Sequence, residues 1–176
     1  MKKILVTGSG GIGGVNFVRA LRVTKEKFFI VGTDFNQYYL EFPDVDVRVN
    51  TPRHSDSQFI PLIKKTISEH SIDFIHPQPS SEALVISEDA ELKQKTFLPN
   101  SSVLSHDKLT TQKILSENNL PVAKTKTLSS IDELHSCFEK LGNDPLWIRS
   151  KKGAGGHLSL LCKNHEEAKY WINLWI

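Results

Sequence analysis

Residues 3–22 read KILVTGSGGIGGVNFVRALR, and this stretch decides the fold of the first part of the chain. Residues 3–7 are rich in β-branched side chains and end at glycines, which predicts a strand and then a tight turn. Apolar side chains then recur at helical spacing and predict a helix over 11–24. They are Ile12, Val15, Val18 and Leu21. We therefore expect a strand, a glycine turn and a helix.

The next segments continue this alternation of strands and helices. Residues 28–34 (FFIVGTD) are predicted to form a second buried strand that ends in an acid, and residues 46–50 a short third strand. Apolar residues on one face predict a helix over 58–70, which leads into a strand at 72–76. Such alternation implies an α/β fold with a Rossmann-like parallel sheet, right-handed crossovers and helices on both faces. Ligands of such sheets bind at the carboxyl ends of the strands.

The pattern changes after residue 105. The sequence predicts a helix over 106–118 and an extended stretch near 124–127. A further helix is predicted over 130–141, and Ser130 with Glu133 would begin it with a capping box.

Two more strands are predicted at 145–149 and 158–162. A glycine loop joins them, so we expect a hairpin and not another βαβ unit. A helix is expected to begin near residue 164. We therefore expect a Rossmann-like domain over 1–105 and a second, α+β domain over 106–176. The last helix has no sheet partner of its own, so the second domain is expected to be incomplete.

Composition and charge argue against several functional classes. The formal net charge is only +2 and the basic residues are interspersed with acids, so we expect no nucleic-acid partner. Cys137 and Cys162 form neither a CxxC motif nor a cluster with histidine, which argues against a disulfide scaffold or a zinc site. Neither a signal peptide nor an apolar run of about 20 residues is recognisable, so we expect a cytoplasmic protein without a membrane span.

Residues 7–14 read TGSGGIGG and match the glycine spacings of dinucleotide-binding folds. Glycines there let a phosphate approach the backbone, so Gly10 and Gly11 are candidate ligand-binding residues, and Asp34 could accept from a ribose hydroxyl. The alternative is that the glycines only allow a tight strand-to-helix connection and that Asp34 caps a turn. A short-chain reductase or epimerase would also carry a YxxxK pair, which none of the three tyrosines makes.

Three segments together resemble ATP-grasp enzymes, specifically the branch of the carbamoyl-phosphate synthase large subunit. Residues 3–22, with VGTD at 31–34 and HPQPSSEAL at 76–84, resemble the pre-ATP-grasp domain. Residues 106–125 (HDKLTTQKILSENNLPVAKT) resemble the segment in which an Asp-Lys pair opens a helix, and residues 145–159 (PLWIRSKKGAGGHLS) resemble a strand and a glycine-rich loop. The resemblance covers nearly the whole chain. It implies a pre-ATP-grasp domain followed by an incomplete ATP-grasp domain.

The resemblance implies that Lys108 and Arg149 bind the phosphates of ATP and that the glycine loop is a mobile lid. A guanidinium can bind two phosphate oxygens and an ammonium acts as a point charge, so both residue types suit this role. The loop residues expected to bind the cofactor are Gly153, Ala154, Gly155 and Gly156. The alternatives are a solvated lysine at a helix start, a structural salt bridge of the arginine, and an ordinary hairpin loop.

Glu82 matches an acid that recurs in the pre-ATP-grasp domain of similar proteins, which makes it a candidate substrate-binding residue. A carboxylate near a helix N-terminus is also stabilised without any ligand, so that reading stays open. The resemblance further implies Mg²⁺. Glu166 and Glu167 lie in a polar helix start that capping explains, so the metal ligands are expected outside this chain.

The resulting hypothesis is that the complete protein, or this chain with a complementary one, uses Mg-ATP to phosphorylate a small-molecule carboxylate. The acyl phosphate would then be joined to a nucleophile. The chain alone is expected to be inactive, and a homo-oligomer is one arrangement left open. Two alternatives remain, an NAD(P)-dependent short-chain reductase or epimerase and a non-catalytic nucleotide-binding module.

Overall fold

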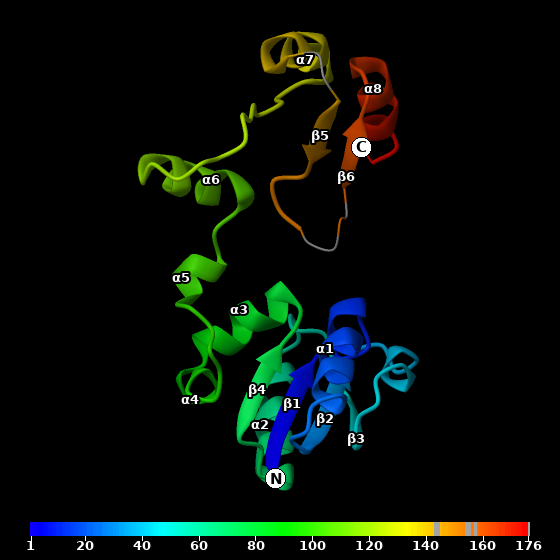
Figure 1. Cartoon of the computed structure of the whole chain (residues 1–176), viewed down its shortest axis with the longest axis vertical. Coiled ribbons are helices and arrows are strands. Elements are labelled where there is room, and N and C mark those ends of the chain that lie inside the picture. Colours follow the sequence, from blue (N-terminus) through cyan, green and yellow to red (C-terminus); the bar gives the residue numbers. More distant parts are fainter. Residues whose placement is uncertain (143–144, 154–155, 157, 176) are drawn as a thin grey trace. The chain divides into compact units, whose positions relative to one another are not determined.

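The structure, a computed structural model, describes residues 1–142, 145–153, 156 and 158–175. The chain divides into two compact units, Met1–Ser105 and His106–Ile176 (Figure 1). No helix among the described residues is long and apolar enough to cross a bilayer.

The first unit is built on a parallel sheet of four strands. These are β1 (Lys2–Thr7), β2 (Phe28–Asp34), β3 (Val47–Asn50) and β4 (Phe74–Pro77), in the spatial order β3-β2-β1-β4. All three neighbouring pairs are parallel, so the predicted parallel sheet is confirmed. The strands therefore present their carboxyl ends at one common edge.

Helices cover both faces of this sheet. α1 (Ile12–Arg22) lies on one face, while α2 (Phe59–His70), α3 (Ser80–Glu88) and α4 (Ala90–Lys93) lie on the other (Figure 1). The unit also holds the 3₁₀ helix η1 (Tyr39–Glu41) and the single-turn helix α5 (Ser101–Leu104).

The two-sided core explains why β1 and β2 are apolar along most of their length. Leu5 and Val31 are register partners, and both are fully buried on the face that α2 and α3 cover. Val6 and Ile30 are fully buried on the face that α1 covers. Each such side chain contributes about 1.5–3 kcal/mol by leaving water. This core fixes the end of β1, which the glycine turn follows, and the end of β2, where Asp34 lies.

The second unit contains an antiparallel hairpin packed on two helices. β5 (Leu146–Arg149) pairs with β6 (Ser159–Cys162), which confirms the predicted hairpin. α7 (Leu134–Leu141) and α8 (His165–Asn173) pack with the inner face of the hairpin in one apolar cluster. The unit also contains α6 (Lys108–Glu117) and the 3₁₀ helix η2 (Ile131–Glu133).

The start of the predicted helix over 130–141 differs from the expected capping box. Its first turn is η2, and the Ser130 hydroxyl accepts from the Asp132 N–H at 3.3 Å, not from the Glu133 N–H. The Glu133 carboxylate accepts from the Ser129 N–H at 3.1 Å. A 3₁₀ turn winds more tightly than an α-helical one, which brings an earlier N–H to the capping hydroxyl. The stretch predicted as extended, 124–127, forms no regular element.

Candidate functional site

Arg149 stands on the outer face of the hairpin in the second unit. Along β5, Leu146 and Ile148 point into the apolar cluster, whereas Trp147 and Arg149 are exposed. This alternation is the ordinary period of a strand with one buried face. Within the described residues, no ion pair or hydrogen bond engages the Arg149 guanidinium. A structural salt bridge therefore does not explain this arginine in the part of the chain that the structure describes.

Lys108 is held at the start of the glycine loop. Its ammonium donates to the Gly153 carbonyl at 2.8 Å and lies 3.5 Å from the Lys151 carbonyl. Its backbone N–H also donates to the Lys151 carbonyl at 3.4 Å. The structure thus brings Lys108 together with the loop that follows Arg149. Lys108 is therefore not a freely solvated side chain.

Asp107, which was not predicted to be a site residue, completes this group. Its carboxylate caps α6 by accepting from the Thr110 N–H at 2.8 Å and lies 3.1 Å from the Lys151 ammonium. The Thr110 N–H and then the Lys151 ammonium lower the pKa of Asp107 to about 2. An Asp before a helix is a recognisable capping signal, but its pairing with Lys151 depends on tertiary structure.

The glycine loop joins the two strands of the hairpin. The Ser150 N–H donates to the Leu158 carbonyl at 2.9 Å and closes the base of the loop. Gly153 and Gly156 have φ values of 104° and 75°, which side-chain-bearing residues adopt at a cost. An added Cβ at Gly156 would meet no atom of the other described residues within 4 Å. Ala154 and Gly155, the other two candidate residues of the loop, lie outside the described residues.

The glycine turn of the first unit is packed against its own chain. An added Cβ at Gly10 would overlap the Tyr39 carbonyl, and one at Gly13 would overlap the Gln78 side chain. Gly14 lies in α1, where an added Cβ would sit 2.5 Å from the Gly8 carbonyl oxygen. These contacts explain Gly10, Gly13 and Gly14 by packing within the unit. Such packing is expected for a tight strand-to-helix connection and is also found in dinucleotide-binding turns, so both interpretations remain.

Gly11 and Asp34 also make contacts within the turn. Gly11 is the N-cap of α1 and donates to the Gly8 carbonyl at 3.2 Å. Asp34 is buried, and its carboxylate accepts from the Gly10 N–H at 3.2 Å and from the Asn36 N–H at 2.9 Å. Of the two roles considered for Asp34, this geometry favours the cap of a turn.

Glu82 is buried beneath the glycine turn, in the first turn of α3. It is 5% exposed, and its Oε2 atom has no hydrogen-bond partner among the residues that the structure describes. Burial raises the pKa of Glu82 to about 7, and the negative charge of Asp34 raises it further. The nearby Thr7 hydroxyl lowers the pKa in part, although it makes no hydrogen bond of ordinary geometry with the described residues. A solvated carboxylate at a helix start therefore does not describe this residue.

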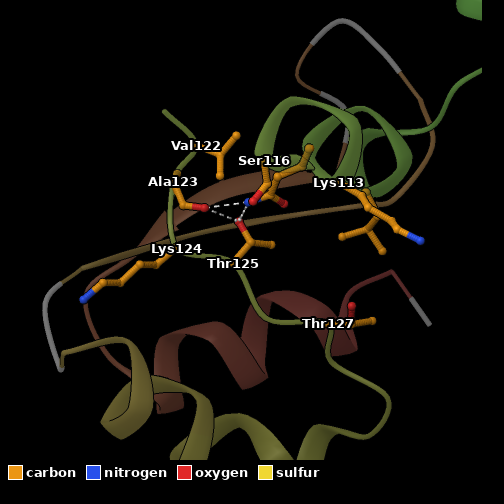
Figure 2. A pocket seen from close by; sticks show the side chains of 9 residues that line it. Lys113, Ser116, Val122, Ala123, Lys124, Thr125 and Thr127 are labelled. Carbon is orange, nitrogen blue, oxygen red and sulfur yellow. Dashed lines mark hydrogen bonds between the residues drawn. The ribbon is translucent and has the colours of Figure 1, made fainter. Parts of the chain in front are cut away.

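An open hollow beside α6 was not expected from the sequence. Its volume is about 400 Å³, and α6 and the segment 122–127 line it (Figure 2). Gln112 fastens the segment to the helix, since its amide nitrogen lies 2.5 Å from the Ala123 carbonyl and 2.7 Å from the Thr125 hydroxyl. None of the candidate residues that the structure describes lines this hollow. These contacts require the folded chain, so no local sequence signal could have shown them.

Comparison with known proteins rests on structure alone. No protein-family model matches the sequence, and no curated protein matches it. Among solved structures, the biotin carboxylase domain of 2-oxoglutarate carboxylase from Hydrogenobacter thermophilus, solved as a dimer with Mg-ADP and bicarbonate, is similar with a TM-score of 0.59 and 18% identity. The match covers 99% of this chain and 40% of that chain.

Two further solved structures are similar over most of the chain. L-amino acid ligase from Bacillus licheniformis matches with a TM-score of 0.58 and 14% identity, over 99% of this chain and 42% of that one. Glycinamide-RNase-transformylase T from Mycobacterium tuberculosis matches with a TM-score of 0.55 and 17% identity, over 89% of this chain and 45% of that one. The chain therefore shares the fold of the corresponding part of these three structures, and it spans less than half the length of each.

Proposed function

We propose that the chain is the N-terminal part of an ATP-dependent ligase of the ATP-grasp type. In this proposal residues 1–105 are a pre-ATP-grasp domain and residues 106–176 the first part of the ATP-grasp domain. The complete protein would phosphorylate a small-molecule carboxylate and join the acyl phosphate to a nucleophile, as the resemblance to the carbamoyl-phosphate synthase large subunit suggests. The remaining residues come from a longer chain or a complementary one.

One observation carries this proposal: the second unit holds an exposed arginine without a partner in its described part, next in sequence to a loop that Lys108 contacts. Both cations suit the oxygens of a polyphosphate, Arg149 as a two-pronged donor and Lys108 as a point charge. In this proposal they bind and orient phosphates and transfer no proton. Gly153 and Gly156 supply backbone that a phosphate can approach closely.

In the complete protein, magnesium would neutralise charge on the phosphates of bound ATP. The described residues contain no group of three or more His, Cys, Asp or Glu that could hold a metal ion. We propose that the magnesium ligands lie outside this chain. The chain alone should then show no Mg-dependent ATP hydrolysis, whereas a longer form that carries the missing part should.

The test is a titration of the 176-residue chain with tripolyphosphate and with Mg-ATP, followed by calorimetry and by tryptophan fluorescence. Trp147 shares the exposed face of Arg149, so it can report a ligand there. Arg149→Ala should weaken tripolyphosphate binding at least about tenfold, because charge-assisted hydrogen bonds to phosphate are lost. The control is Arg53→Ala in the other unit, where Arg53 stacks on the Phe35 ring at 4.1 Å. Equal losses in both variants, or none in Arg149→Ala, would refute the proposed site.

A further inference from the structure

The start of α6 and the start of the glycine loop are tied together from both sides. Lys108 holds the loop backbone through the carbonyls of Lys151 and Gly153, at 3.5 and 2.8 Å. In the other direction, the Lys151 side chain reaches back to the Asp107 carboxylate at 3.1 Å. Two residues adjacent in sequence therefore bind one short stretch of the loop by different groups.

These contacts restrict a side chain that is otherwise very mobile. A lysine ammonium sits on a flexible four-carbon stem and has three N–H donors. Two of the donors of Lys108 can be directed to the loop carbonyls, which leaves one for an anion. If the loop moved away from α6, the ammonium would lose these acceptors and its fixed position.

Asp107 is well suited to hold the loop in place. Its side chain is only 11% exposed, whereas that of Lys151 is 59% exposed. The lowered pKa of Asp107 keeps it ionised at any pH near neutrality. Its two oxygens do different work, since Oδ1 caps α6 through Thr110 and Oδ2 faces Lys151.

We propose that Asp107 and Lys151 are a positioning pair, which holds the loop on α6 and so keeps Lys108 oriented toward an anionic phosphate group. Asp107 does not touch the ligand in this arrangement. The inference rests on the proposed function, because it takes Lys108 to be a phosphate-binding residue. It adds two residues to the site and gives a reason for a carboxylate to stand next to a phosphate-binding lysine.

The decisive variant is Asp107→Asn, which removes the charge that faces Lys151 but keeps a side chain that caps helices well. If Asp107 were only a nearby negative charge, its removal would strengthen binding of tripolyphosphate to the full chain. A positioning role predicts the opposite sign, a weakening of about threefold, the size expected for an ion pair near the surface. Unchanged or tighter binding by Asp107→Asn would overturn the inference.

The loop supplies a matched pair of charge controls. Lys151→Met and Lys152→Met each remove one positive charge from the same loop, but the Lys152 side chain has no partner among the described residues. Lys151→Met should weaken tripolyphosphate binding more than Lys152→Met, and Asp107→Asn should add nothing in the Lys151→Met background. Equal effects of the two lysine variants would overturn the inference.

Hydrogen exchange separates a failure of this inference from a failure of the proposed function. The Lys108 amide donates to the Lys151 carbonyl, so it should exchange faster in Asp107→Asn and Lys151→Met than in the wild type or Lys152→Met. Unchanged exchange overturns the pairing even where phosphate binds. If wild-type protein binds neither tripolyphosphate nor Mg-ATP, the proposed function fails and the positioning role falls with it, whatever the exchange shows.

Discussion

The two glycine-rich segments look alike in sequence, but glycine serves a different purpose in each. In the turn over 7–14, Gly10 and Gly14 are needed because backbone of the same unit lies against them. In the loop after Arg149, Gly153 and Gly156 have positive φ values and space around them. In the first segment, which we call the packing joint, glycine is needed because nearby atoms leave no room for a side chain. In the second segment, glycine is needed because the backbone adopts positive φ values. A glycine motif therefore indicates a ligand only after packing has been considered.

The largest expected effect tests the packing joint. Gly14→Ala should destabilise the first unit by about 3 kcal/mol or more, because overpacking against backbone cannot be relieved by a side-chain movement. The new Cβ would lie 2.5 Å from the Gly8 carbonyl oxygen and 2.6 Å from the Ser9 Cα atom. Urea unfolding followed by circular dichroism, with hydrogen exchange of β1, measures this. Gly11→Ala is the control, since its nearest atom would be 3.5 Å away. Similar losses in both variants would contradict the packing explanation.

The next effect concerns the acid beneath that joint. The folded pKa of Glu82 is about 7, above its ordinary value of 4.5, so the stability of the first unit should be fully present below about pH 4.5 and decline as the pH rises through 7. The loss by pH 8 should be about 3 kcal/mol, since the rise from 4.5 to about 7 is multiplied by about 1.4 kcal/mol per pKa unit. Glu82→Gln should abolish most of this dependence. Unfolding of both proteins between pH 4 and 8 measures it, and an equal slope in the variant would refute the role of Glu82.

A smaller effect is expected in the loop. Gly156→Ala should destabilise the second unit by about 1 kcal/mol, the cost of a left-handed conformation for a residue with a Cβ. Gly156→Asn should cost less, because asparagine tolerates that conformation. The tryptophans all lie in this unit, so their fluorescence during denaturation follows its stability. A loss as large as that of Gly14→Ala would show that the loop is also a packing joint.

The smallest expected effect belongs to Arg149. Arg149→Ala should change the unfolding free energy of the second unit by less than about 0.5 kcal/mol, because the side chain is exposed and has no partner among the described residues. Its effect should appear in ligand binding alone. A destabilisation above about 1 kcal/mol in fluorescence-monitored unfolding would assign Arg149 a structural role.

Local features of the fold could be predicted from the sequence because they depend on neighbouring residues. The second strand was predicted over 28–34 and forms there, since its β-branched run ends at a polar turn. The prediction of a capping box at Ser130 was wrong because the first turn is a 3₁₀ turn. Its tighter winding brings the N–H of Asp132, and not that of Glu133, to the Ser130 hydroxyl.

The candidate site was less predictable because its contacts join distant parts of the chain. Lys108 was selected by resemblance, but its bond to Gly153 spans more than 40 residues, as does the pairing of Asp107 with Lys151. The covering of Gly10 by Tyr39 likewise depends on where the segment after β2 returns to the sheet. The spacing of residues along the sequence does not show which distant residues come into contact in the folded chain.

The position of β1 in the sheet has a consequence for how the first unit folds during synthesis. β1 lies between β2 and β4, and β4 follows it in the chain by roughly 70 residues. At a synthesis rate of about 5–20 residues per second, β1 waits roughly 3 to 14 seconds on the ribosome before its second neighbour exists. During that interval one edge of an apolar strand has no partner, and unpaired edges of this kind recruit other chains. During synthesis, β1 is therefore open to pairing with other chains. Once β4 has been made and has paired with it, both edges of β1 are covered.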